Sequence, residues 1–224
     1  RRCDKTYTSN KALTDVTPPS GRIIINSGDK YANTASVTLG LEAYDKESGV
    51  ASVDINGDVE RSATVPWPSG VNSLKWPLKL SNGDGRKTVY VKFKDKAGNI
   101  SSTVSDDITL DTTPPTITIK SPSSGASISG KFTFSVEVSD NYSISKVKLK
   151  FGSNIIKEFT ESSGTEVTKK SYSVEVDTSN PSVGDGKYSL LAEAFDLAGN
   201  SGSSELSVNV VSASKTQVWP LPQK

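Results

Sequence analysis

Four acidic residues in the first half of the sequence have the types and the spacing of a cation site. Asp45 and Glu47 stand in a turn-like segment after one run of alternating apolar residues, Asp95 ends a second run, and Asp111 follows a third. Hard cations such as calcium take about six to eight oxygen ligands, from carboxylates, backbone carbonyls and water. We therefore predict a calcium site formed by these four side chains, at the junction between the two halves of the chain.

The second half of the sequence repeats only part of this acidic set. Asp140 and Asp196 correspond to Asp45 and Asp95, but no aspartate follows the last apolar run of this half. The pattern therefore favours calcium less in the second half than in the first. In both halves the alternative interpretation is that each aspartate accepts hydrogen bonds from the backbone of its own turn and binds no ion.

Two aromatic residues in expected loops are candidates for ligand binding. Trp67 stands between two prolines, and Tyr142 follows an Asp-Asn pair. Either ring could stack on a sugar, or it could anchor its own loop instead. Trp76 is different, because it keeps the inward phase of an alternating run and is expected to lie in the core.

The composition argues against catalysis. The 224 residues include no histidine and one cysteine, Cys3, which excludes histidine-based triads and an intrachain disulfide. There is no Gly-x-Ser-x-Gly motif, and nothing marks two carboxylates as an acid–base pair. We therefore expect no enzymatic activity, with Cys3 either a free thiol or a link to another chain.

Charge and hydropathy exclude two further classes of protein. The formal net charge is +1, with 26 basic and 25 acidic residues interspersed, so nucleic-acid binding has no basic stripe to support it. No apolar run reaches the roughly 18 residues that a membrane-spanning helix needs. Methionine is absent, so we expect a processed chain or a fragment of a longer one.

The sequence contains an internal repeat. Residues 83–99 and 184–200 share Gly-Asp-Gly, an alternating run that ends in Asp, and Ala-Gly-Asn, at a constant offset of 101 residues. Upstream, the Asp-x-Thr-Pro-Pro segments that begin at Asp15 and Asp111 match at an offset of 96 residues. One supersecondary unit of roughly 100 residues has therefore been duplicated.

Within each copy, apolar and polar residues alternate, which is the period of a strand and not of a helix. Short runs of this kind, separated by Gly, Asn, Asp and Ser turns, are typical of an antiparallel sandwich. The fold class that we predict is all-β, with two tandem immunoglobulin-like antiparallel β-sandwiches joined by a short Pro-Pro linker. The expected division is a tail or linker over 1–15, domains over 16–111 and 112–211, and a Pro-containing tail over 212–224.

Three motifs together resemble a known family. They are the Asp-Thr-Thr-Pro-Pro junction at Asp111, the strand ends Asp-x-Ala-Gly-Asn at Asp95 and Asp196, and the Asp-x-Glu-Ser-Gly-Val turn at Asp45. Over residues 15–211 the chain resembles the bacterial immunoglobulin-like repeats of large surface proteins and adhesins. Some related repeats are stiffened by calcium between domains. The turn at Asp140 departs from the pattern, because it lacks Ser-Gly-Val.

The resemblance implies a non-catalytic extracellular module that acts as a rigid spacer or display stalk on a cell surface. Because a fold does not fix a function, two alternatives stay open. The chain could be a subunit of a self-assembling surface filament or surface layer, or it could supply accessory glycan-binding or spacer domains to a secreted polysaccharide-degrading enzyme. The expected partners are other protein chains, including copies of this one, or extracellular glycans, and calcium is the one cofactor expected.

Overall fold

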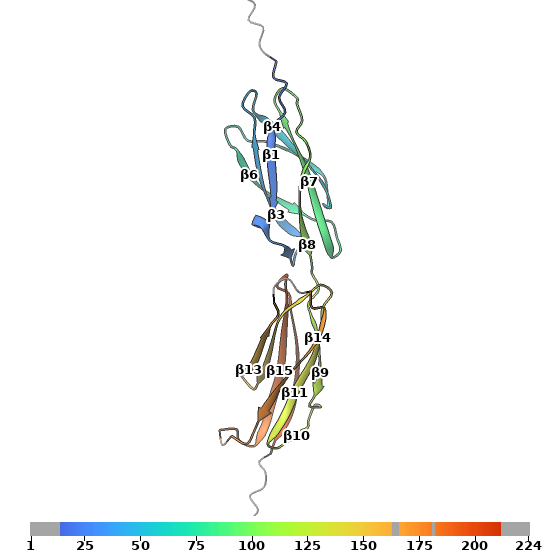
Figure 1. Ribbon diagram of the computed structural model, residues 1–224, viewed down its shortest axis with the longest axis vertical. Coiled ribbons are helices and arrows are strands. Elements are labelled where there is room, and N and C mark those ends of the chain that lie inside the picture. Colours follow the sequence, from blue (N-terminus) through green and yellow to red (C-terminus); the bar gives the residue numbers. More distant parts are fainter. Residues whose placement is uncertain (1–13, 163–165, 181, 212–224) are drawn as a thin grey trace, which may run out of the picture. The chain divides into compact units, whose positions relative to one another are not determined.

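The computed structural model describes residues 14–162, 166–180 and 182–211, so the predictions for Cys3 and for residues 212–224 lie outside the described residues. The chain divides into two compact units, Arg1–Leu110 and Asp111–Lys224. Within the described ranges the regular elements are β-strands, apart from one short 3-10 turn, η1 (Asn26–Gly28), which confirms the all-β prediction (Figure 1). No helix among these residues is long and apolar enough to cross a membrane.

The first unit is a sandwich of two sheets. One sheet has the order β1 (Ser20–Ile25), β3 (Ser36–Tyr44), β6 (Ser73–Lys79). The other has the order β2 (Tyr31–Ala32), β8 (Val104–Leu110), β7 (Gly85–Asp95), β4 (Val50–Gly57), β5 (Ala63–Pro66). Neighbouring strands are antiparallel except for β2 and β8, because the chain crosses from the first sheet to the second at η1.

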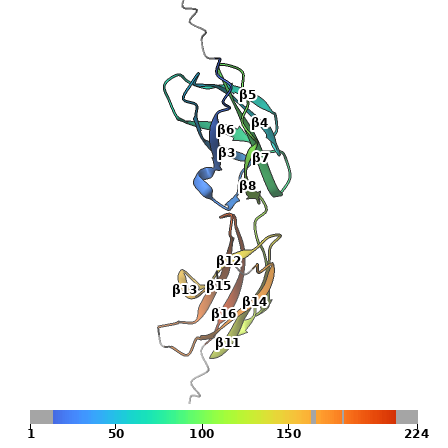
Figure 2. The same ribbon diagram turned by 45° about the horizontal axis from the view of Figure 1, so that its top comes forward.

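The second unit repeats this topology strand for strand. Its smaller sheet has the order β14 (Lys169–Asp177), β11 (Lys131–Ser139), β9 (Thr116–Ser121). Its larger sheet has the order β10 (Ser127–Ile128), β16 (Ser201–Val210), β15 (Gly186–Asp196), β12 (Ile144–Phe151), β13 (Asn154–Thr160). The sheets of both units can be followed in Figure 2, and their equal strand orders agree with the duplication found in the sequence.

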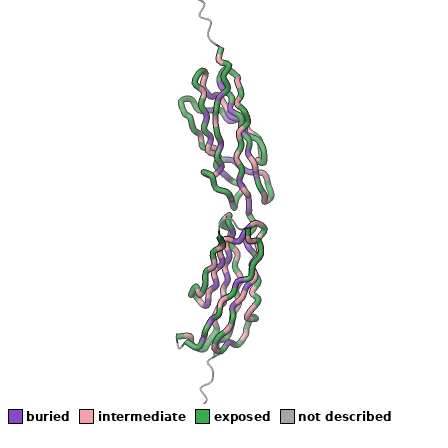
Figure 3. Tube along the Cα trace, in the orientation of Figure 1, coloured by how far each residue is buried: buried purple, intermediate pink, exposed green. Residues whose placement is uncertain are grey.

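Each unit has its own apolar core, formed by the inward residues of both of its sheets. The largest fully buried side chains include Phe93, Leu39 and Ile55 in the first unit and Phe134, Leu149 and Leu190 in the second. Buried and exposed positions alternate along the strands, as the period of two predicts (Figure 3). Trp76 packs against the first core, in the inward phase that its run indicated.

Strand register brings three segments together at one end of each unit. In the first unit Ser20 pairs with Tyr44, and Val50 pairs with Asp95. The start of β1, the β3–β4 turn and the end of β7 therefore lie at the same end of the sandwich. The register of β9 with β11, and of β12 with β15, repeats the arrangement in the second unit.

Candidate metal centres

The first unit gathers three aspartates where these segments meet. Asp15 comes before β1, Asp45 follows β3, and Asp95 ends β7. One carboxylate oxygen from each lies within 4.8 Å of the other two. Asp95 is only 1% exposed, and the other two are half-buried. The segments next to β1, β3 and β7 thus place three acidic side chains close together at a partly buried position.

Asp95 is held in place by the turn that follows it. Its Oδ1 accepts hydrogen bonds from the backbone N–H groups of Gly98 (2.6 Å) and Asn99 (2.8 Å), and its Oδ2 accepts one from Asn99 Nδ2 (2.8 Å). Gly98 has φ +102°, which a residue with a side chain rarely adopts. Burial alone would raise the pKa of Asp95, but the hydrogen bonds, mainly from Asn99, outweigh it and lower that pKa.

The other two aspartates of this cluster also have defined geometry. Asp45 Oδ1 accepts hydrogen bonds from the N–H groups of Ser48 (2.9 Å) and Gly49 (2.6 Å). Asp15 Oδ1 accepts one from Thr17 N (2.9 Å), and the backbone carbonyl of Asp15 accepts one from Asn99 Nδ2 (3.2 Å). Part of each carboxylate therefore serves its own turn, as the alternative interpretation of the sequence expected.

The second unit contains an equivalent cluster of Asp111, Asp140 and Asp196. Again one carboxylate oxygen of each lies within 4.8 Å of the others, and Asp111 and Asp196 are 1% and 3% exposed. Asp196 Oδ1 accepts a hydrogen bond from Asn200 N (2.8 Å), and Asp196 Oδ2 accepts one from Asn200 Nδ2 (2.7 Å). The turn after β15 therefore repeats the geometry of the turn after β7.

The remaining contacts of the second cluster come from the β11–β12 turn. Asp140 Oδ1 accepts hydrogen bonds from the N–H groups of Tyr142 (2.9 Å) and Ser143 (2.8 Å). Asp111 Oδ1 accepts one from Asn141 Nδ2 (3.0 Å). This turn lacks Ser-Gly-Val, yet it places its aspartate in the cluster just as the first unit does.

The environment of the second cluster disfavours uncompensated negative charge. Burial raises the pKa of Asp111 above its ordinary value, and the nearby charges of Asp196 and Asp140 add to the rise, although hydrogen bonds from the protein oppose it. Burial likewise raises the pKa of Asp140, again with a contribution from Asp196. Two of the three carboxyl groups would thus be stabilised by a positive charge between them.

Each cluster also contains one carboxylate oxygen that is buried and unpartnered. Asp15 Oδ2 and Asp140 Oδ2 each expose less than 1 Å² and accept no hydrogen bond from the described part of the chain. None of the ion pairs formed by the described residues includes an aspartate of either cluster. Because buried carboxylate oxygens are normally paired, both clusters have the donor set of a site that a cation completes.

The structure divides the residues that the sequence grouped into one site. It brings Asp45 and Asp95 together, but it places Asp111 in the second unit, with Asp140 and Asp196. Glu47 is exposed and belongs to neither cluster. Asp15, which takes the place expected of Asp111, was missed, although its Asp-x-Thr-Pro-Pro match to Asp111 was the signal that could have identified it.

The two candidate aromatic residues have mainly structural contacts. Trp67 is 7% exposed, its ring meets Phe93 edge-on at 5.7 Å between centroids, and its Nε1 donates to the Val71 carbonyl at 2.9 Å. This is the loop anchor that the sequence left as the alternative to sugar stacking. Tyr142 is half-buried, and its backbone N–H serves the turn of Asp140. The Trp67 side chain is therefore committed to contacts within its own domain.

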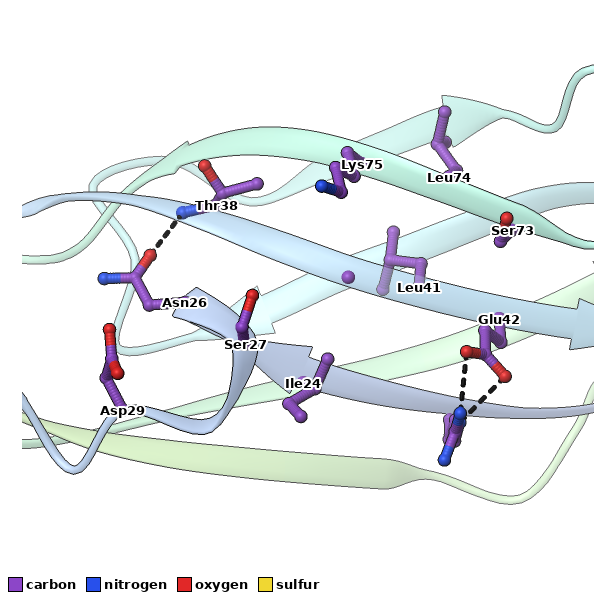
Figure 4. Close-up of a pocket in the computed structure, with 12 residues that line it drawn as sticks. Ile24, Asn26, Ser27, Asp29, Thr38, Leu41, Glu42, Ser73, Leu74 and Lys75 are labelled. Carbon is purple, nitrogen blue, oxygen red and sulfur yellow. Dashed lines mark hydrogen bonds and ion pairs between the residues drawn. The ribbon is translucent and has the colours of Figure 1, made fainter.

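A surface hollow of about 770 Å³ lies on the outward face of the β1–β3–β6 sheet (Figure 4). Two pairs of its polar groups contact each other. Arg22 forms a two-point ion pair with Glu42, at 2.7 and 2.8 Å, and Asn26 Oδ1 accepts a hydrogen bond from Thr38 N at 2.8 Å. The described residues that line this hollow thus show no nucleophile paired with a base.

Comparison with known sequences finds one family. The sequence model of a family described as bacterial Ig domain matches residues 115–192. No curated protein matches the chain.

Comparison with solved structures finds several proteins of similar architecture. The fibronectin(III)-like modules of Clostridium thermocellum CbhA share 14% identity at a TM-score of 0.44, with 85% of this chain and 95% of that chain covered. A D1–D4 ectodomain fragment of ICAM-5 shares 12% identity at a TM-score of 0.46, with 89% and 53% covered. A tetra-tandem repeat from the extending region of a large adhesion protein shares 22% identity at a TM-score of 0.34, with 88% and 50% covered.

The resemblance to bacterial Ig-like repeats is thus confirmed for residues 115–192, which match the sequence pattern of the bacterial Ig domain family.

Proposed function

We propose that this chain is a non-catalytic spacer module of an extracellular bacterial surface protein, and that each of its two Ig-like domains binds one calcium ion. One observation carries the proposal. Both domains gather three aspartates at the same end of the sandwich, and each cluster includes a buried carboxylate oxygen without a hydrogen-bond partner. A duplicated fold that repeats an incomplete acidic cluster is more simply explained by a shared ligand than by turn geometry alone.

Calcium fits these clusters better than magnesium. Calcium–oxygen distances are about 2.3–2.6 Å, so ligands on opposite sides of the ion are about 5 Å apart. Three oxygens within 4.8 Å of one another are therefore close enough to contact one calcium ion. Magnesium demands shorter distances and a regular octahedron, whereas calcium accepts irregular sets of carboxylates, carbonyls and water such as two turns and a preceding segment provide.

The proposed ion would join the chain ahead of each domain to the body of that domain. In the second domain, Asp111 directly follows Leu110, the last residue of β8. Calcium bound by Asp111, Asp140 and Asp196 would therefore fix the residue that directly follows the last strand of the first domain. Such a junction restricts flexibility, which is what a spacer requires. The partners that we propose are other protein chains or extracellular glycans.

An extracellular location agrees with this kind of site. Extracellular calcium modules function with dissociation constants of about 10⁻⁴ to 10⁻³ M, an affinity that a few carboxylates from separate loops can supply. The family match to a bacterial Ig domain supports the same setting.

Thermal unfolding with and without calcium tests the proposal. Calcium at about 100 times its dissociation constant stabilises a site by about 2.7 kcal/mol, or very roughly 10 °C for a domain of this size. We expect Asp95→Asn to remove the shift from the first unit alone, and Asp196→Asn to remove it from the second alone. The matched control is Asp107→Asn, which alters a surface ion pair with Arg86 and should keep both shifts. Unchanged melting of the wild type in about 100 mM calcium, which is about 100 times the upper dissociation constant expected, would refute the proposal.

A further inference from the structure

The Ala-Gly-Asn motif ends in a residue that contacts two parts of each cluster at once. Asn200 Nδ2 donates to Asp196 Oδ2 at 2.7 Å and to the backbone carbonyl of Asp111 at 2.8 Å. Asn99 Nδ2 makes the same two contacts in the first unit, with Asp95 Oδ2 at 2.8 Å and the carbonyl of Asp15 at 3.2 Å. We propose that Asn99 and Asn200 are the positioning residues of the two calcium sites, an inference that rests on the proposed function.

Each asparagine bridges segments that are far apart in the sequence. The contact from Asn200 to Asp111 spans 89 residues, and the contact from Asn99 to Asp15 spans 84. The carbonyl that accepts the bond belongs to the same residue whose carboxylate enters the cluster. Fixing that peptide group therefore limits where the carboxylate can point. A turn-stabilising asparagine would need only the contact to its own turn, so the second contact indicates a role in assembling the cluster.

The chemistry of the side chain suits this role. A primary amide nitrogen carries two N–H donors, and here one reaches a carboxylate and the other a carbonyl. A carboxylate oxygen has two lone pairs, so the bond from Asn200 to Asp196 Oδ2 leaves capacity on that oxygen for a cation. The amide is neutral and lies beside three carboxylates without adding to their repulsion. Aspartate at this position would lack the donors and add a fourth negative charge.

The rest of the motif supports the same arrangement. Gly98 and Gly199 precede the two asparagines with φ +102° and +92°, a conformation that glycine adopts at little cost. This turn folds each asparagine back over the aspartate four positions earlier, while that aspartate also accepts the backbone N–H of the asparagine. The glycine thus shapes the turn, and the asparagine connects the turn to the segment ahead of the domain.

Calorimetric titration of the full chain with calcium chloride tests the inference. The wild type is expected to bind two ions. Asn200→Ala should leave one site at wild-type affinity and weaken the other by about 10- to 100-fold, the usual effect of losing a residue that orients metal ligands. The control is Val208→Ala, which truncates a fully buried core residue of the same unit. It should lower the melting temperature of that unit without changing its calcium affinity while folded.

The possible results separate this inference from the proposed function. If the wild type binds no calcium, both are refuted. If the wild type binds two ions and Asn200→Ala binds both equally well, the positioning role is refuted and the calcium sites stand. A loss of affinity in Val208→Ala equal to that in Asn200→Ala would also refute it, because the effect would then be one of stability. Should Asn200→Ala unfold its unit, Asn99→Ala with Val91→Ala as its control makes the same test in the first unit.

Discussion

A polar triad in the second unit shows how single residues make its stability depend on pH. The Tyr172 hydroxyl donates to Glu161 Oε1 at 2.7 Å, and Lys170 Nζ contacts the same carboxylate at 2.9 Å. Hydrogen bonds from Lys170 and then Tyr172 lower the pKa of Glu161 below its ordinary value. Because the folded-state pKa is lowered, the stabilisation is fully present above the ordinary pKa of glutamate and is lost as the pH falls through the lowered value.

Tyr172→Phe isolates one part of this triad. The ring would keep its packing against Phe159, but the hydroxyl donor would be lost. We expect the pKa of Glu161 to rise towards its ordinary value and the unfolding free energy of the second unit at neutral pH to fall by about 1–2 kcal/mol. Carbon-detected NMR titration and urea unfolding across a pH series measure these two effects. An unchanged pKa of Glu161 would show that Lys170 alone sets its charge, and Tyr90→Phe in the first unit provides the control.

At the scale of elements, the start of β16 and the segment before β9 approach each other closely in the second unit. A Cβ atom added at Gly202 would lie 2.0 Å from the carbonyl oxygen of Pro115. Since non-bonded atoms do not approach so closely, any side chain here forces the segment that follows Asp111 away from β16. Glycine at this position therefore keeps the beginning of the domain against its last strand.

Gly202→Ala should accordingly destabilise the second unit by about 2 kcal/mol or more, as overpacking does when backbone must move. The matched control is Gly184→Ala, where an added Cβ meets nothing within 4 Å. That variant should be neutral or slightly stabilising, because alanine reduces the entropy of the unfolded chain. Denaturant unfolding of both variants compares them directly, and equal stabilities would show that the Pro115 segment yields easily.

The sequence predicted most elements, and it missed those whose apolar residues do not alternate. The long strands are half-buried, so a period of two identifies them. Strands β2 and β10 have two residues each and carry no period, and β5 has only four. Strand β13 reads Asn-Ile-Ile-Lys-Glu-Phe-Thr, in which a register shift against β12 breaks the alternation. Edge strands of this kind are fixed by pairing, which a single sequence does not display.

The candidate sites show a similar limit. Asp45 and Asp95 could be grouped because each follows a strand pattern at one end of the same domain. Asp111 stands between the last strand of one domain and the first strand of the next, so its position in the sequence fits either. Its backbone carbonyl and carboxylate accept hydrogen bonds from Asn200 and Asn141, and these long-range contacts assign it to the second domain.

At the scale of the whole molecule, one structural plan is used twice. Each unit has its own core, the same strand order, and an acidic cluster built from the segment ahead of the domain and two turns. The turns that carry Asp45 and Asp140 differ in sequence. The residue that precedes β4 is Gly49, whereas the residue that precedes β12 is Ser143. The position of the three carboxylates is thus retained although the loop that carries one of them has changed.

The most direct test of this account is a crystal structure of the chain grown with calcium, with anomalous scattering used to locate the ions. We expect one ion in each unit, the first contacting Asp15, Asp45 and Asp95 and the second contacting Asp111, Asp140 and Asp196, with oxygen distances of about 2.3–2.6 Å. Water molecules in both clusters, or ions bound only at other places on the chain, would contradict the account.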